Sequence, residues 1–353
     1  MKFSSRRLAL YTAAFGLLMV GAVQPSLAQS KYSLKWDDFS NGFSAGGATD
    51  KWFYFAAGPF VGNDGITSTS SQGLYVKAGG TNPSTGLPAF TLTMGQEGSA
   101  ENPYSFPGAF DHVKWLVYAN HPASSGYPGF DAVPGQELMF DEWIGGRGYG
   151  NELNPFGAAV TDPNDDIRLA TPAMNTIDLE TFLVSDFFLT NKRIYALYER
   201  LPFGRTPGHN YAAFTYCIPV ATRQPGQMSH LSIAYNRSAG TMRWLVDDVE
   251  VFRVSHLGYR IDRQYMVLDH GGVEEPVVCR QRDVGMGMFT LLDAGSPTQQ
   301  ALVELSNTPD MYFSTAVGEP TPQVFVDSLS LHNSRLWGEG ADMRVKKVTV
   351  SSR

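Results

Sequence analysis

The stretch that decides the fold reads Gly-Gln-Glu-Leu-Met-Phe-Asp-Glu-Trp-Ile-Gly-Gly and covers residues 135–146. Apolar Leu138 and Phe140 alternate with acidic Glu137 and Asp141, which is the period of a half-buried β-strand. Glycines at both ends are typical of turns and are expected to bracket the strand. Three carboxylates fall within six residues, which packing alone does not require. The plain interpretation is a strand with one solvated polar face.

Similar short runs recur along the whole chain. The composition of 36 Gly, 21 Pro and 12% aromatic residues indicates a turn-rich, mostly β protein. Strands are expected at 51–56, 73–78, 90–94, 112–118, 178–190, 193–201, 212–220, 230–235, 241–254, 264–269, 285–292 and 342–350. The last of these keeps its apolar residues on one face only with a shift in phase. This spacing predicts a sandwich or barrel with long loops, and one domain over residues 29–353. A short helix is expected at 297–306.

The first 28 residues resemble a cleavable leader. Lys2, Arg6 and Arg7 precede an apolar run over 8–23, and Ser-Leu-Ala at 26–28 fits a cleavage site. We therefore predict a signal peptide at 1–28 and a secreted or periplasmic protein. Either the general secretory route or the twin-arginine route would serve, since residues 5–10 partly match the twin-arginine motif. Beyond the leader, the sequence holds no apolar run of membrane-spanning length.

The charge of the chain limits its partners. The formal net charge is −7, and removal of the three basic residues of the leader makes it −10. An acidic surface argues against nucleic acid or an anionic membrane as partner.

Neither the cysteines nor the histidines predict a metal site. Cys217 and Cys279 are the two cysteines, and either one disulfide or two buried thiols fits their apolar surroundings. The seven histidines lack the spacing of metal ligands. The acidic cluster at 162–166 suits either a structural calcium or a solvated turn. No other cofactor is expected.

Two downstream segments resemble a known family. Residues 230–235 (HLSIAY) and 242–251 (MRWLVDDVEV) look like the paired strands of concanavalin A-like lectin/glucanase domains, which laminarinases and lichenases write as H-x-Y-x-I-x-W and I-x-W-x-V-D-G-x-x-V. Residues 198–202 (YERLP) resemble the F-E-A-R-I-K strand of these enzymes, and 343–350 resemble their final strand. The resemblance implies an all-β, concanavalin A-like sandwich (jelly roll).

A second resemblance carries no activity. Residues 36–39 (WDDF) and 267–272 (VLDHGG) are similar to segments of a group of secreted proteins of uncharacterised function. This group would be a branch of the same superfamily.

The glucanase resemblance suggests catalytic residues. Its E-x-D-x-x-E motif is matched in spacing by Glu137 and Glu142, with Met139 in place of the aspartate. The resemblance implies that Glu137 is the nucleophile and Glu142 the acid/base, and the cluster of carboxylates on this strand suggests that Asp141 modulates their pKa values. Residues five apart on an ideal strand face opposite sides, so this pair requires a β-bulge between them. Without a bulge, Glu137 and Asp141 share a face.

Other residues are candidates for sugar binding. Aromatic rings offer flat apolar faces to pyranose rings, while charged neighbours bond the hydroxyl groups. The candidates are Trp115, Trp143, Arg147, Tyr149, Tyr118, Glu199 and His270. Because sandwiches bury their tryptophans, at least half of the aromatic residues are expected in the core.

These observations predict a carbohydrate-active protein that cleaves a polysaccharide such as a β-glucan with paired carboxylates on a concave sheet. One alternative is a carbohydrate-binding or matrix protein without catalysis. Another is an unrelated enzyme activity on the same scaffold. The expected partner in the first two cases is a polysaccharide or oligosaccharide.

Overall fold

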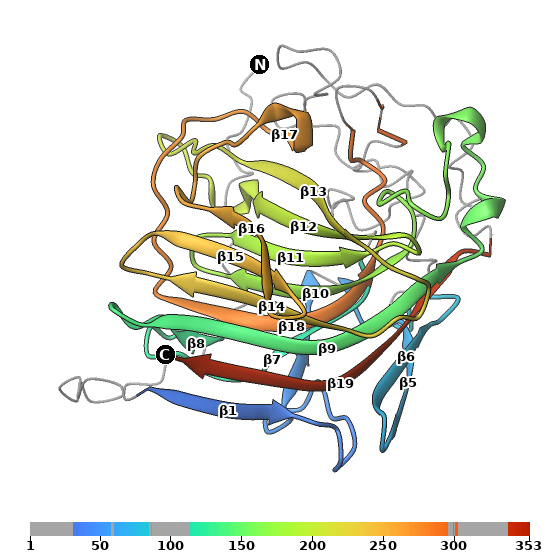
Figure 1. The fold of residues 1–353 in the computed structure, drawn as a ribbon, viewed down its shortest axis with the longest axis horizontal. Coiled ribbons are helices and arrows are strands. Elements are labelled where there is room, and N and C mark those ends of the chain that lie inside the picture. The colour runs from blue at the N-terminus through green and yellow to red at the C-terminus, as the bar shows by residue number, and fades with distance from the viewer. Residues whose placement is uncertain are drawn as a thin grey trace, which may run out of the picture. The chain divides into compact units, whose positions relative to one another are not determined.

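Two antiparallel sheets dominate the computed structural model (Figure 1). It describes residues 31–57, 60–84, 86, 113–295, 299, 301–302 and 338–353. Residues Lys31–Arg353 form one compact unit. None of the helices among the described residues has the length and apolar character needed to cross a membrane.

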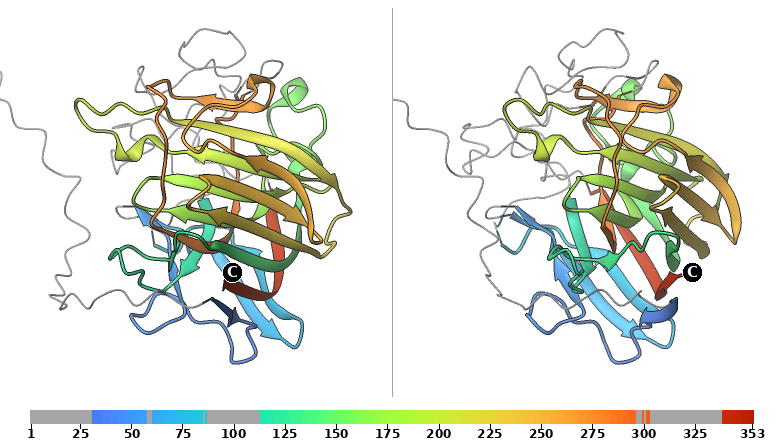
Figure 2. Two further views of the ribbon diagram at one scale, coloured as in Figure 1. Left: turned by 60° about the vertical axis from the view of Figure 1, so that its left-hand side comes forward. Right: turned by 90° about the vertical axis from the view of Figure 1, so that its left-hand side faces the viewer.

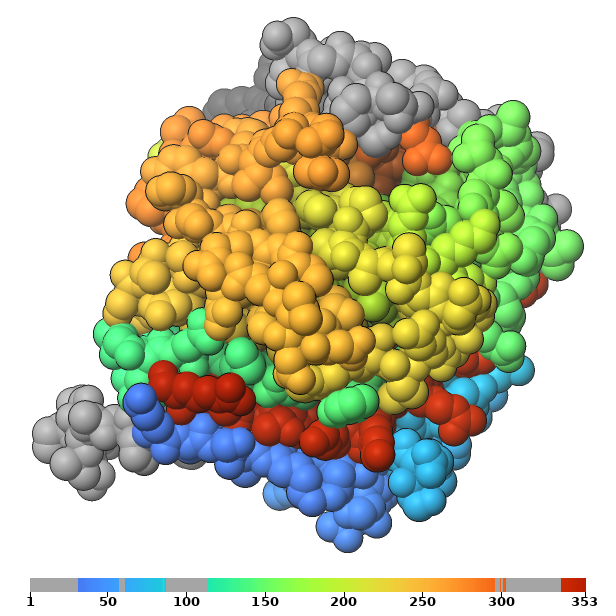
Figure 3. All heavy atoms as spheres, viewed as in Figure 1, coloured from blue at the N-terminus to red at the C-terminus, as the bar shows by residue number. Residues whose placement is uncertain are grey.

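Sheet A contains the central strand β9 (Glu137–Tyr149) between β14 and β19. Its order is β16 (Val249–Val254), β15 (Thr241–Val246), β14 (Ser229–Asn236), β9, β19 (Gly340–Ser352), β6 (Gly73–Ala78) and β5 (Gly65–Ser70), and β1 (Tyr32–Asp37) also pairs with β19. Figure 3 shows β19 at the surface beside β1.

Sheet B is formed mainly by the middle of the chain. Its order is β17 (Met266–Asp269), β13 (Phe214–Thr222), β12 (Arg193–Arg200), β11 (Leu183–Leu189), β10 (Thr171–Asp178), β18 (Gln281–Phe289), β7 (Val113–Ala119) and β2 (Trp52–Tyr54), and β8 (Phe130–Asp131) pairs with β18. A separate ribbon joins β3 (Ala56–Ala57) to β4 (Phe60–Val61). The short 3-10 turns of the described residues are η2 (Asn151–Leu153), η3 (Gly157–Ala159), η4 (Pro202–Gly204) and η5 (Arg263–Tyr265). The two layers are seen from the side in Figure 2. This architecture confirms the predicted all-β sandwich of the jelly-roll type.

The main core lies between the sheets. Leu138 and Phe140 of β9 meet Met174 of β10 and Phe187 of β11 in one buried cluster. Sheet B also buries its other face, where Val184 and Phe188 belong to a second cluster. Burial on both faces explains why the strands of sheet B read as continuous apolar runs. We call the face of each sheet that points away from the other sheet its outer face.

Several strand boundaries differ from expectation. Gly145 and Gly146 lie inside β9 and not in a turn. Glycine is needed at 146 because a Cβ atom there would stand 2.3 Å from the Asp342 carbonyl oxygen of β19. The expected strands at 178–190 and 241–254 are each split by a turn. The second turn uses Asp247 and Asp248 at φ 49° and 67°, a left-handed pair that suits a tight hairpin.

The predicted shift of phase in the last strand is confirmed. The pairing of β19 with β9 changes register between Val345 and Lys347. This β-bulge keeps Met343 and Val345 in the core before it and Val348 in the core after it. The expected strand at 90–94 lies outside the described residues, and of the expected helix at 297–306 only residues 299, 301 and 302 are described.

The structure also describes two features that the sequence left open. Cys217 and Cys279 are free thiols, Cys279 in the main core and Cys217 in the second cluster. The acidic cluster at 162–166 is a turn whose carboxylates pair with arginine and lysine side chains. The pairs are Asp162–Lys192, Asp165–Arg193 and Asp166–Arg168. Among the described residues no group of side chains is arranged to hold a metal ion.

Candidate functional site

Glu137 and Glu142 lie on opposite faces of sheet A. Glu142 points into the core beside Leu138 and Phe140, whereas Glu137 and Asp141 are on the outer face. The register of β9 with β14 runs without a shift from Ser229–Ile144 to Asn236–Glu137. The bulge that the glucanase-like pair requires is therefore missing between the two glutamates, and the structure does not bring them together.

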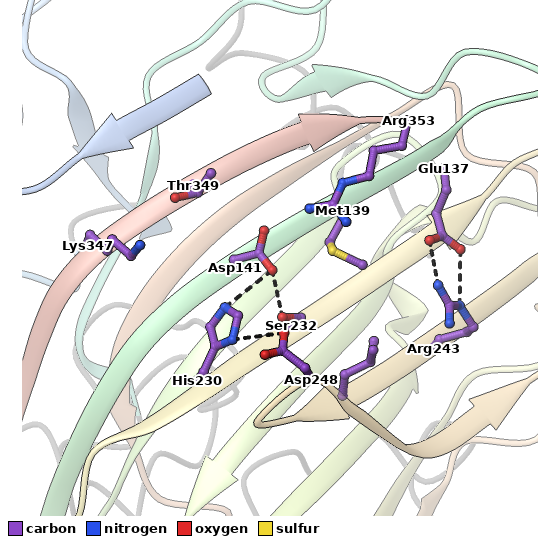
Figure 4. Close-up of a pocket in the computed structure, with 11 residues that line it drawn as sticks. Glu137, Met139, Asp141, His230, Ser232, Arg243, Asp248, Lys347, Thr349 and Arg353 are labelled. Atoms are coloured by element: carbon purple, nitrogen blue, oxygen red, sulfur yellow. Dashed lines mark hydrogen bonds and ion pairs between the residues drawn. The ribbon is translucent and has the colours of Figure 1, made fainter. Parts of the chain in front are cut away.

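Glu137 and Asp141 instead line a hollow of about 430 Å³ on the outer face of sheet A (Figure 4). Asp141 accepts a hydrogen bond from the Ser232 hydroxyl at 2.7 Å. The His230 ring lies between two carboxylates, with Nε2 3.5 Å from Asp141 and Nδ1 3.2 Å from Asp248. We call this feature the sheet A hollow.

The two carboxylates of the hollow are too far apart for glycoside chemistry. Four residue steps along a strand span roughly 13 Å, whereas a catalytic carboxyl pair stands about 5–9.5 Å apart. Glu137 is also occupied, because both of its oxygens accept from the Arg243 guanidinium. The hollow therefore offers polar contacts but no acid/base pair from β9.

A different set of acids lies on the outer face of sheet B. Asp186 of β11 is buried and accepts from the Thr176 amide and from the Asn175 side chain, each at 2.8 Å. Glu199 of β12 keeps part of its surface open to solvent and accepts from the Thr215 hydroxyl at 2.6 Å. We call Asp186, Glu199 and Asp283, together with Asn175, Tyr118 and Thr215, the carboxylate row.

Burial changes the protonation of these acids. It raises the pKa of Asp186 to about 7, although the donors from Thr176 and Asn175 and the charge of Arg282 act in the opposite direction. It raises the pKa of Glu199 to about 8, and the negative charge of Asp186 adds to this effect. Near neutral pH these groups can therefore both give and take a proton.

The strand register sets the spacing of the two acids. Asp186 pairs with Leu197, and Val184 pairs with Glu199, so Asp186 and Glu199 are diagonal neighbours on one face. Diagonal neighbours on adjacent strands are roughly 7–8 Å apart. Two catalytic carboxyl groups about 6.5–9.5 Å apart leave room for a water molecule between them, and side chains that start from diagonal positions can reach such a separation.

From Asp186 the row continues across β10, β18 and β7 and reaches β2. Asn175 pairs with Gly285, Gly285 with Tyr118, and Tyr118 with Phe53. Gly285 allows the Tyr118 ring to pack closely against the sheet, because a Cβ there would stand 2.5 Å from that ring. At this end the ring centroids of Phe53 and Phe55 lie 6.0 and 6.3 Å from the centroid of the Tyr118 ring. Both phenylalanines are only partly buried, whereas Tyr118 itself is buried.

Two buried oxygen atoms in the row lack a hydrogen-bond partner among the described residues. They are Oδ1 of Asn175 and Oδ2 of Asp283. Burial also raises the pKa of Asp283 well above its usual range. An unbonded buried polar atom is costly in a closed core and calls for an explanation, such as a polar ligand.

The remaining candidates from the sequence are scattered. Trp115 is fully buried between the sheets and is core, so it cannot line a surface subsite. Arg147 pairs with Asp342 at 3.0 Å, and Tyr149 lies near Lys77 at the end of β9. The backbone amide of His270 donates to the Ala213 carbonyl at the edge of sheet B. Only Tyr118 and Glu199 belong to the carboxylate row.

Sequence reasoning missed Asp186, Asp283 and Asn175. A signal was present, because Asp186 interrupts the apolar run LVSDFFL and Asp283 lies in RDVGMGMF. An acid in a strand buried on both faces is rarer than three acids on a strand with one polar face. The isolated acids in apolar strands were therefore more informative than the three acids of β9.

Fold and site together define a class: a β-sandwich protein with titratable carboxylates on one sheet face. The chain belongs to a family of unknown function, DUF6081, whose model matches residues 36–353. The match begins at the tryptophan of the WDDF motif. There Asp37 accepts hydrogen bonds from the Trp52 indole and the Phe39 amide, so the motif fastens β1 to the core.

The chain is similar to "Uncharacterized protein L829" of Acanthamoeba polyphaga mimivirus, with 29% identity over 290 residues. The match covers 67% of this chain and 61% of that protein, so the chain spans less than two thirds of its relative. Among solved structures, it is similar to Apo Crh5 transglycosylase, with 12% identity, a TM-score of 0.38, and coverage of 92% of this chain and 85% of the other. It is also similar to alginate lyase A1-II', with 8% identity, a TM-score of 0.38, and coverage of 81% and 82%.

Proposed function

We propose that this protein cleaves a polysaccharide at the carboxylate row of sheet B, with Glu199 as general acid and Asp186 as general base. The observation that carries the proposal is a pair of acids that are diagonal neighbours on one sheet face, with pKa values raised to about 7 and about 8. Glycoside hydrolysis requires such a pair in opposite protonation states.

The hydrogen bonds assign the two roles. Two N–H donors stabilise the ionised form of Asp186, and its pKa is the lower of the two, which suits a base. Asp186 would take a proton from a water molecule whose oxygen attacks the anomeric carbon. Glu199 would give its proton to the departing glycosidic oxygen, so the pair regains its charge by exchange of one proton with solvent. This spacing favours inversion at the anomeric carbon.

The rest of the row has the composition of a sugar site. Sugar-binding sites combine apolar and aromatic surfaces with a few fixed polar groups. Phe53, Phe55 and Tyr118 supply the aromatic surface, and the free oxygens of Asn175 and Asp283 supply hydrogen-bond acceptors. Because the chain is acidic, we propose an uncharged polymer such as a β-glucan, and a secreted protein that meets it after removal of residues 1–28.

The test is product release from a panel of β-glucans and other polysaccharides. Asp186→Asn and Glu199→Gln keep the size of each side chain and remove the titrating proton. Each should lower the rate by about 10²–10⁴-fold. The matched control is Glu142→Gln, an equal exchange at a buried acid in the core between the sheets, which should keep the rate within a few-fold.

Two results would contradict the proposal. If both variants still release products, the carboxylate row does not catalyse the cleavage. No products from any polymer, with polymer binding that needs the row, would favour the alternative of a carbohydrate-binding protein without catalysis.

A further inference from the structure

The outer face of sheet A carries a second feature that the proposed catalytic row does not use. Trp143 exposes 37% of its surface and stacks on the His230 ring at a centroid distance of 5.1 Å and an angle of 10°. His230 is the direct partner of Trp143 on β14, and Lys347 is its direct partner on β19. The indole therefore stands between an imidazole on one side and a lysine on the other.

The ring of Trp143 is held in place from the His230 side. Asp141 and Asp248 lie within 3.5 and 3.2 Å of the two His230 nitrogens, and Ser232 in turn bonds Asp141. Figure 4 shows these side chains converging between β9 and β14. With one indole face covered by the stacked imidazole, the other face is turned toward β19, where Lys347 and Thr349 line the sheet A hollow.

The charges of the hollow select the class of ligand. Glu137 and Arg243 neutralise one another, and Lys347 and Arg353 balance Asp141 and Asp248. A buried patch of Met139, Ala234 and Leu245 forms an apolar floor. A flat aromatic face next to the Lys347 amine and the Thr349 hydroxyl, at the border of a hollow with balanced charges, suits an uncharged sugar ring better than an ion.

We propose that the β19 side of Trp143 is a separate, non-catalytic binding surface for an uncharged polysaccharide. A pyranose ring stacks on the indole, and the Lys347 ammonium and Thr349 hydroxyl donate to its hydroxyl groups. The surface lies on a different sheet from the carboxylate row. It therefore binds the polymer whether or not the row cleaves it.

The experiment measures binding of soluble β-glucans by affinity electrophoresis and by quenching of tryptophan fluorescence, in the Glu199→Gln background so that polymer is not consumed. Trp143→Ala should weaken binding at least about tenfold, and Trp143→Phe, which keeps a smaller ring, should weaken it less. Tyr127→Ala is the matched control, because Tyr127 is equally exposed at 38% but lies in a loop away from the hollow.

The outcomes separate this surface from the catalytic row. In the catalytically intact protein, Trp143→Ala should leave the rate on short soluble oligosaccharides unchanged while it lowers retention on the polymer. Unchanged polymer binding by Trp143→Ala would overturn the proposal. Equal losses on polymer and short oligosaccharides would also overturn it, because the surface beside Trp143 would then belong to the reaction site. If the protein cleaves no polysaccharide but Trp143→Ala still weakens polymer binding, only the proposed enzyme activity is contradicted.

Discussion

The consequence of burying a single acidic side chain in this protein depends on the sheet face on which it lies. Glu142 was the expected acid/base, yet it lies in the core with neither side-chain oxygen bonded to a described residue. Asp186 is equally buried but accepts two hydrogen bonds from N–H groups. The first arrangement only costs folding free energy, whereas the second prepares a base.

Replacing Glu142 by Leu should stabilise the fold. Burial raises the pKa of Glu142 well above its usual range, so the folded protein holds a proton that the unfolded chain releases above its ordinary pKa. Stability is therefore lost as pH rises, and Glu142→Leu removes this loss. We expect a gain of about 1–3 kcal/mol in the free energy of unfolding. Urea unfolding at pH 5 and pH 8 checks this, and a gain that is not larger at pH 8 would contradict it.

Individual strands show how far the sequence could predict this fold. The period of 138–140 placed β9 and its apolar face correctly, because alternation depends only on burial of one side. The two glycines at 145–146 were misread as a turn. Glycine is required there by the close approach of β19, a segment nearly 200 residues away in the sequence. The local sequence pattern carries no information about that contact.

The central strand should not tolerate a side chain at Gly146. A Cβ there would stand 2.3 Å from the Asp342 carbonyl and 2.8 Å from Pro172 Cγ. Gly146→Ala should therefore cost about 1–3 kcal/mol of unfolding free energy through overpacking. Gly80→Ala is the control, because a Cβ at Gly80 meets nothing within 4 Å. Equal melting temperatures for the two variants would show that β9 and β19 lie further apart.

At the scale of the whole molecule, the sandwich presents two different surfaces on its two outer faces. Composition and strand spacing were enough to predict the sandwich. The site was not predictable in the same way, because Asp186, Asn175, Gly285 and Tyr118 meet only through the pairing of β11, β10, β18 and β7. The E-x-x-x-x-E spacing in β9 suggested a pair of glutamates that the structure places on opposite faces, since a motif read along one strand cannot show which face its members share.

The most direct test of the account is the pH dependence of kcat/KM on a cleaved polysaccharide. With pKa values of about 7 for Asp186 and about 8 for Glu199, kcat/KM should rise as the base loses its proton and fall as the acid loses its own. The account predicts a narrow optimum between these values and loss of the alkaline limb in Glu199→Gln. An optimum near pH 4–5, where ordinary exposed carboxyl groups titrate, or a profile unchanged in Glu199→Gln, would contradict it.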